Sequence, residues 1–101
     1  MEKKIETLIN SSPVFLFMKG TPEEPLCGFS AKVVDILHQS GVNFSSVDIF
    51  GDEEIRQGVK GYSHWPTYPQ LYVQGKLVGG CDLVAEIAES GELKEVLRKV
   101  R

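Results

Sequence analysis

The chain has 101 residues and a net charge of −3, with 42% hydrophobic and 25% charged residues. This length and composition indicate one folded, soluble domain rather than a disordered or membrane protein. The basic residues are scattered along the sequence, which excludes a typical nucleic-acid-binding surface. The longest apolar run, Val14 to Met18, is far too short to span a membrane. We therefore expect neither a nucleic-acid partner nor a membrane partner.

The first half of the chain shows two helical patterns, two strand patterns and a third, shorter helix. A short amphipathic helix is predicted at residues 3 to 12, a strand buried on both faces at 14 to 18, and an irregular loop with two prolines at 21 to 26. Apolar residues then mark a helix that ends near Gly41: Phe29, Val33, Ile36 and Leu37. Residues 44 to 50 are predicted as a second strand, and residues 52 to about 60 as a helix with an acidic start.

The second half begins with Trp65 to Pro69, which cannot be helical. Two short strands follow at 70 to 73 and 77 to 78, joined by a turn in which Gly75 supplies the positive φ. Gly79 and Gly80 end the second of these strands. Asp82 is predicted as the N-cap of a helix whose inward residues are Leu83, Val84, Ile87 and Ala88. A last helix is marked by Leu93, Val96, Leu97 and Val100.

This order of elements restricts the fold. A strand, a helix and a second strand at 14 to 50 require a parallel, right-handed crossover, whereas the hairpin at 70 to 78 must be antiparallel. A mixed four-stranded sheet with helices on both faces satisfies both conditions. We therefore predict an α/β chain with the three-layer α/β/α thioredoxin-like fold, as a single domain over residues 1 to 101.

Cys27 stands where the proline-containing loop passes into a helix. The free N–H groups at a helix N-terminus favour a thiolate, which is the form that attacks disulfides and binds metals. Lys19 adds positive charge if the loop folds back. The spacing is that of Cys-x-x-Cys with Ser30 in the second position, so a redox cycle or metal site at Cys27 must take its other sulfur from elsewhere. A buried structural cysteine is the alternative, and the polar loop argues against it.

Four separated motifs together resemble the monothiol glutaredoxins of the Cys-Gly-Phe-Ser type: Lys19–Pro22, Cys27–Ser30, Trp65–Gln70 and Gly79–Asp82. The resemblance covers essentially the whole chain in the right order, and the extra loop from Thr21 to Leu26 is typical of this group. It implies the thioredoxin fold, glutathione binding and a [2Fe–2S] cluster held between two subunits. It also implies a monomer without the cluster, a homodimer with it, and delivery of the cluster to client proteins.

The resemblance further implies the role of each site residue. Cys27 is then both the catalytic thiol and the cluster ligand, and Lys19 contacts the glycine carboxylate of glutathione and the sulfur. Arg56 contacts a glutathione carboxylate. Without the resemblance, Lys19 is equally well explained as an ordinary surface lysine, and Arg56 is better explained as a surface charge.

The remaining implied site residues lie in the second half of the chain. A cis peptide bond before Pro69 exposes the backbone of Tyr68, which can pair with the glutathione backbone. Gly80, Cys81 and Asp82 open a helix whose free N–H groups suit the γ-glutamyl carboxylate, while Asp82 accepts from its ammonium group. For Cys81 the residue type itself favours small-residue packing first, and a disulfide with Cys27 second.

Three functions remain open from the sequence. A cluster carrier needs four ligands, which two copies of Cys27 and two glutathione thiols would supply. A monothiol reductase would use Cys27 to attack a glutathione mixed disulfide, which a second glutathione then resolves. An interaction module within a larger protein is the third, because the chain ends directly after its last helix, as one domain of a thioredoxin–glutaredoxin protein would. The charged segment from Met1 to Thr7 resembles no signal peptide, so we expect a cytoplasmic location, with the nucleus as an alternative.

Overall fold

The computed structural model describes residues 2–98, in which the elements follow the predicted order with one additional 3-10 turn. The helices are α1 (Glu2–Ile9), α2 (Gly28–Ser40), α3 (Glu53–Ser63), α4 (Cys81–Ser90) and α5 (Glu92–Arg98). The strands are β1 (Val14–Met18), β2 (Ser45–Asp48), β3 (Gln70–Val73) and β4 (Lys76–Gly79), and the turn η1 spans Ile49–Gly51. Val100, predicted to be part of the last helix, and both ends of the predicted domain lie outside the described residues.

The four strands form one mixed sheet in the order β2-β1-β3-β4. β1 and β2 are parallel, whereas β3 is antiparallel to both β1 and β4. The parallel pair is joined through α2, which is the crossover expected between parallel neighbours. The predicted mixed four-stranded sheet is confirmed.

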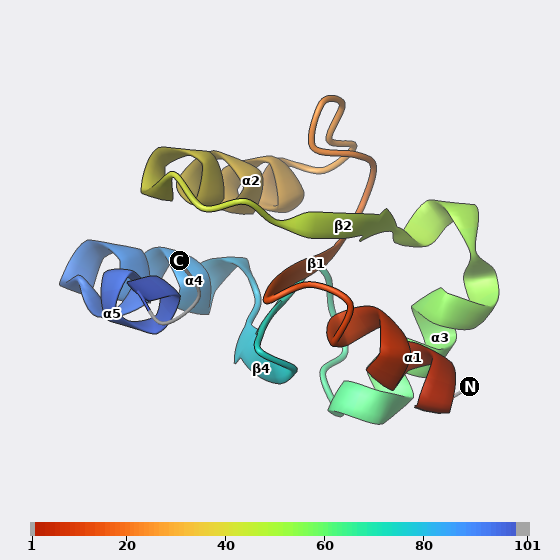
Figure 1. The fold of residues 1–101 in the computed structure, drawn as a ribbon. Coiled ribbons are helices and arrows are strands. Elements are labelled where there is room, and N and C mark those ends of the chain that lie inside the picture. Colours follow the sequence, from red (N-terminus) through yellow and green to blue (C-terminus); the bar gives the residue numbers. More distant parts are fainter. Residues whose placement is uncertain (1, 99–101) are drawn as a thin grey trace.

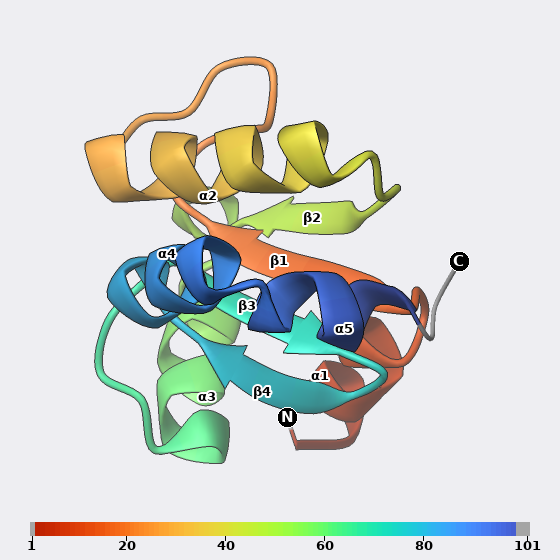
Figure 2. The ribbon, with the colours of Figure 1, turned by 90° about the vertical axis from the view of Figure 1, so that its left-hand side faces the viewer.

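Helices cover both faces of this sheet (Figures 1 and 2). α2, α4 and α5 lie on one face, and α1 and α3 on the other. β1 contributes to the packing on both faces, because successive side chains of a strand point to opposite faces. Val14, Leu16 and Met18 enter the core beneath α2, α4 and α5, called the first core here. Phe15 and Phe17 enter the second core, beneath α1 and α3. All five residues are buried. This is the three-layer α/β/α, thioredoxin-like arrangement that the sequence predicted.

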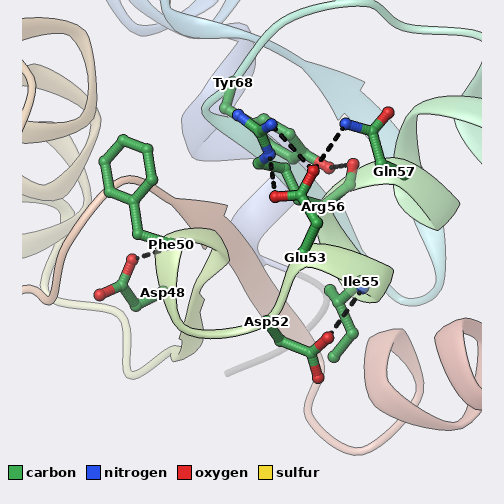
Figure 3. Close-up of polar contacts among 8 residues, drawn as sticks. All are labelled: Asp48, Phe50, Asp52, Glu53, Ile55, Arg56, Gln57 and Tyr68. Atoms are coloured by element: carbon green, nitrogen blue, oxygen red, sulfur yellow. Dashed lines mark hydrogen bonds and ion pairs between the residues drawn. The ribbon is translucent and has the colours of Figure 1, made fainter.

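Two elements in the middle of the chain differ from the prediction. The strand predicted at 44 to 50 is shorter, because Asp48 Oδ1 accepts the N–H of Phe50 (2.9 Å) and turns the chain into η1 (Figure 3). The helix predicted at 52 to about 60 continues to Ser63, because Tyr62 packs against the second core. Asp52 caps this helix by accepting the N–H of Ile55 (3.1 Å).

The first helix and the hairpin also differ in their ends. α1 ends at Ile9 rather than near residue 12. Between β3 and β4 the turn is two residues long: Gln74 and Gly75 both have positive φ (52° and 79°), and Lys76 already belongs to β4. The positive φ predicted for Gly75 is confirmed, and the two-residue turn matches the twist of antiparallel strands.

The start of α4 corrects two further expectations. The N-cap residue is Gly80 and not Asp82, which lies exposed in the first turn. Leu83, predicted to point inward, is 38% exposed, because α4 packs through Val84 and Leu83 lies about 100° away around the helix. Phe29 in α2 is likewise 61% exposed rather than part of the buried stripe, which begins at Ser30.

Candidate functional site

The loop between β1 and α2 folds back on itself and places Cys27 near the end of β1. Gly20 and Pro25 form an isolated antiparallel bridge, and the N–H of Leu26 donates to the carbonyl of Lys19 (2.9 Å). Figures 1 and 2 show this loop projecting beyond the rest of the fold. Cys27 is then the N-cap residue of α2, with extended backbone (φ −150°, ψ 138°) and a partly exposed side chain.

The position of Cys27 makes its thiol more acidic. The backbone N–H of Ser30 has the largest effect in lowering the pKa of Cys27, the N–H of Phe29 and the charge of Lys19 add to it, and partial burial opposes all three. Cys27 is the N-cap residue of α2, and its side chain makes no capping hydrogen bond. The N–H groups that lower its pKa are those of the first turn of α2, which have no partner within the helix. The thiolate is the nucleophilic and metal-binding form of cysteine, so this site favours both kinds of chemistry.

Ser30 has a structural role that the sequence did not reveal. Its side chain is completely buried, and its Oγ accepts the backbone N–H of Lys19 (3.1 Å). This hydrogen bond joins the first turn of α2 to the end of β1. The sequence showed only that Ser30 stands where a second cysteine would stand, and contained no local signal for this contact between residues eleven positions apart.

A cleft of about 340 Å³ opens beside Cys27 and collects most of the predicted site residues. Its lining residues come from the ends of β1, α2, the segment before β3, and α4: Lys19, Phe29, Trp65, Thr67, Tyr68, Gly80, Cys81, Asp82 and Leu83. Five of these were predicted site residues, namely Lys19, Tyr68, Gly80, Cys81 and Asp82. The prediction missed Phe29, Thr67 and Leu83 as lining residues. From the sequence, Trp65 is a packing or rim aromatic near the site, and the structure places it in the lining. Cys27, Arg56 and Pro69 are not lining residues.

Where α4 forms the wall of the cleft, the backbone of Gly80 lies close to Pro69 and Trp65. A Cβ atom at Gly80 would lie 3.2 Å from both the carbonyl oxygen of Pro69 and the indole Nε1 of Trp65. The first N–H groups of α4 have no partner within the helix, as at any helix N-terminus. Gly80, the N-cap residue, has no side chain that could accept from them. The indole N–H of Trp65 is buried and has no hydrogen-bond partner in the described part of the chain. The cleft therefore contains several donors near one helix N-terminus.

Cys81 differs from Cys27 in both burial and acidity. Its side chain is buried in the core formed by α2, α4 and α5, which agrees with the packing role considered for it. Burial is the main cause that raises the pKa of the Cys81 thiol; Asp82 and Cys27 raise it further, and Lys32 opposes them. Both cysteines are free thiols. Cys27 is therefore the more reactive of the two.

Arg56 lies on α3 and is held by a residue of its own helix (Figure 3). Its terminal guanidinium nitrogen, Nη2, donates to Oε1 of Glu53 (3.0 Å), and its Nε lies 3.0 Å from Oε2, an ion-pair contact without hydrogen-bond geometry. The hydroxyl of Tyr68 donates to the backbone carbonyl of Arg56 (2.7 Å), which connects α3 to the cleft. The prediction missed Glu53, although its spacing of three residues from Arg56 on a helix was a readable signal.

The peptide bond between Tyr68 and Pro69 is cis, as predicted. Tyr68 is buried, and burial is the main cause that raises the pKa of its phenol group, so the hydroxyl remains a neutral donor at physiological pH.

Residues 2–98 contain no helix with the length and hydropathy needed to cross a bilayer.

Comparison with known proteins shows the family to which the chain belongs. The family model described as Glutaredoxin matches residues 14–78. Monothiol glutaredoxin-S11 of Oryza sativa subsp. japonica is 60% identical over 99 residues, which are 98% of this chain and 20% of that protein. The chain thus spans about a fifth of the length of this curated relative. The Probable monothiol glutaredoxin 2 of Rickettsia felis is 51% identical over 94 residues, which are 93% of this chain and 90% of that protein.

Solved structures show the same fold. The solution structure of reduced poplar apo GrxS14 superimposes with a TM-score of 0.86 at 47% identity, covering 98% of this chain and 91% of the other. The crystal structure of a buckwheat glutaredoxin–glutathione complex superimposes with a TM-score of 0.87 at 25% identity, covering 98% and 88%. From its family match, its relatives and its single cysteine in Cys27–Ser30, this chain belongs to the glutaredoxin family as a monothiol member.

Proposed function

We propose that this monothiol glutaredoxin binds glutathione in the cleft and, as a homodimer, holds a [2Fe–2S] cluster through Cys27 of each copy for delivery to client proteins. The observation that carries the proposal is a partly exposed thiol with a lowered pKa beside a cleft, with Ser30 in place of a second thiol. When bound, the cluster supplies a unit of iron and sulfide that can be passed on, or used in electron transfer.

The cleft has the donors that glutathione requires. Glutathione carries two carboxylates, an ammonium group and a peptide backbone. The free N–H groups of α4 suit the γ-glutamyl carboxylate, exposed Asp82 suits its ammonium group, and Lys19 suits the other carboxylate. Tyr68, before the cis-proline, offers its backbone for pairing. A relative from buckwheat, which shares the fold, has been solved in complex with glutathione.

Ligand counting supports the shared cluster. Clusters of this kind take four thiolate-type ligands. Within residues 2–98, no three His, Cys, Asp or Glu side chains gather as a metal site, so Cys27 needs ligands from outside the chain. A second copy and two glutathione thiols complete the set. Leu26 and Phe29 flank Cys27 in the sequence and are 61% exposed each, so they offer apolar surface that a second copy would cover.

Anaerobic reconstitution with iron, sulfide and glutathione tests the proposal. Visible absorbance should appear, elute with a dimer in size exclusion, and correspond to one cluster and two glutathiones per two chains. Cys27→Ser should abolish the absorbance, because a hydroxyl does not replace a soft thiolate ligand. Cys81→Ser tests the buried thiol as a ligand, and here we expect the absorbance to remain. A cluster that survives Cys27→Ser, or that forms on a monomer without glutathione, would contradict the proposal.

The lowered pKa of Cys27 also favours a second candidate, a glutathione-dependent reductase of mixed disulfides. The Cys27 thiolate would attack the sulfur of the glutathione moiety, release the client thiol and become glutathionylated itself. A second glutathione thiolate would then release glutathione disulfide and restore the Cys27 thiolate. A colourless protein that rapidly reduces glutathione mixed disulfides would support this candidate over the cluster carrier. Either function fits a reducing compartment such as the cytoplasm or the nucleus.

A further inference from the structure

Arg56 is a cation on α3 that the resemblance to monothiol glutaredoxins assigns to a glutathione carboxylate, yet in the structure a carboxylate of this chain already holds it. Glu53 contacts its guanidinium group through both oxygens, Oε1 to Nη2 and Oε2 to Nε, each at 3.0 Å. Figure 3 shows these contacts on one side of α3, next to Tyr68. The same guanidinium group would need to bind the carboxylate of the ligand.

We propose that Glu53 competes with glutathione for Arg56, which lies outside the cleft lining but is joined to it through the hydroxyl of Tyr68, and that Glu53 thereby lowers the affinity of the chain for glutathione. The inference rests on the proposed glutathione binding, and it adds Glu53 as a residue that sets affinity. A guanidinium group has five N–H donors, and Glu53 lies against the edge formed by Nε and Nη2. A ligand carboxylate must therefore displace Glu53 from this edge or bind the remaining donors beside a group of like charge, and either route lowers its affinity.

The exposure of the pair makes displacement possible. The side chains of Arg56 and Glu53 are 33% and 67% exposed, and exposed ion pairs contribute little to stability. The hydrogen bond from Arg56 lowers the pKa of the Glu53 carboxyl, so Glu53 is charged at neutral pH and competes as an anion. The hydroxyl of Tyr68 holds the backbone of Arg56 in place, so only the side chain has to change partners.

Gln57 gives Glu53 a second partner. Its Nε2 donates to Glu53 Oε1 at 3.1 Å, the oxygen that also accepts from Arg56. This contact keeps the Glu53 carboxylate beside the guanidinium group when thermal motion loosens the ion pair. When a ligand displaces Glu53, the carboxylate still has Gln57 as a partner, which lowers the cost of the exchange.

A purely structural role for Glu53 predicts a different result. An acidic residue in the first turn of a helix, paired with a cation three residues later, stabilises the helix by itself. In that case Glu53→Gln would lower the melting temperature slightly and leave the glutathione affinity of the folded protein unchanged.

Calorimetric titration of the full chain with glutathione separates the two roles. Glu53→Gln should raise the affinity about twofold to fivefold, the scale expected for removing one exposed, salt-screened charge contact. Glu54→Gln is the matched control, because it removes the same charge from the neighbouring exposed position, and no contact with Arg56 is found for Glu54 in the described residues. It should change the affinity by less than Glu53→Gln does.

Two further titrations identify the groups involved. In an Arg56→Gln background, Glu53→Gln should no longer raise the affinity, because there is no guanidinium group to release. Because the N–H groups of α4 suit the γ-glutamyl carboxylate, we assign Arg56 to the glycine carboxylate, together with Lys19. With glutathione esterified at its glycine carboxylate, Glu53→Gln should therefore likewise have no effect.

The outcomes are distinct. Equal effects of Glu53→Gln and Glu54→Gln would leave only a general charge effect and overturn the competition. A lower affinity in Glu53→Gln would mean that Glu53 orients Arg56 for the ligand, which also overturns it. An effect that persists with the ester would mean that Arg56 binds the γ-glutamyl carboxylate, which would overturn its assignment to the glycine carboxylate. If the wild-type chain binds no glutathione at all, both this inference and the proposed function are wrong.

Discussion

Ser30 stands where a second active-site thiol would stand, and its hydroxyl group is completely buried against the backbone of Lys19. We expect Ser30→Ala to destabilise the fold, because the N–H of Lys19 then loses its acceptor in a part-buried position. An unsatisfied buried donor of this kind costs about 1–3 kcal/mol of unfolding free energy. In a domain of this size, each 1 kcal/mol lowers the melting temperature by roughly 4–8 °C.

Thermal and urea unfolding followed by circular dichroism measure this loss, with Ser45→Ala as the control. Ser45 lies exposed on β2, so the same substitution there should change the unfolding free energy by about 0.5 kcal/mol or less. Ser30→Ala should also raise the pKa of Cys27 slightly, because the Ser30 hydroxyl is the weakest of the groups that lower it. If Ser30→Ala melts at the wild-type temperature, the hydrogen bond contributes nothing to stability and the argument is wrong.

Three other expectations concern the acidity of Cys27, the packing at Gly80 and the helix position of Gly61. Alkylation of Cys27 by iodoacetamide should rise with pH around a midpoint below that of an ordinary cysteine, since the thiolate reacts and its pKa is lowered. Lys19→Gln should move this midpoint upward, and an unmoved midpoint would remove Lys19 as a cause. Gly80→Ala should displace Trp65, shift the emission of this single tryptophan and weaken glutathione binding; unchanged emission would contradict the close packing. Gly61→Ala, a helical position with open space around it, should instead raise stability by about 0.5–1 kcal/mol, as unfolding would show.

Much of the fold was predictable because its signals are local. The apolar run from Val14 to Met18 predicts a strand covered on both faces, and the structure places its side chains alternately in two cores. The break before Cys27 and the periodicity after it predicted a helix N-terminus there, which α2 confirms. The turn at Gly75 was predictable from the backbone freedom of glycine.

The ends of elements were less predictable, because tertiary contacts decide them. Asp48 ends β2 by accepting the N–H of Phe50, and the same oxygen accepts the N–H of Gly20 (3.0 Å), which is far away in sequence. Tyr62 extends α3 because a hydrophobic core is there to receive it. A pattern of apolar residues does not show which of its members a neighbouring helix will cover.

The sequence by itself determined the order of the elements, the single reactive cysteine at a helix N-terminus and the family to which the chain belongs. Those features depend on backbone preferences and on residue identity along short stretches. Only the tertiary structure decided that Ser30 holds the backbone of Lys19, that Phe29 is exposed beside the cleft, and that Trp65 packs against Gly80. Each of these depends on which segments the fold brings together, because hydrogen bonds and packing contacts act over a few ångströms in space, whatever the separation in sequence.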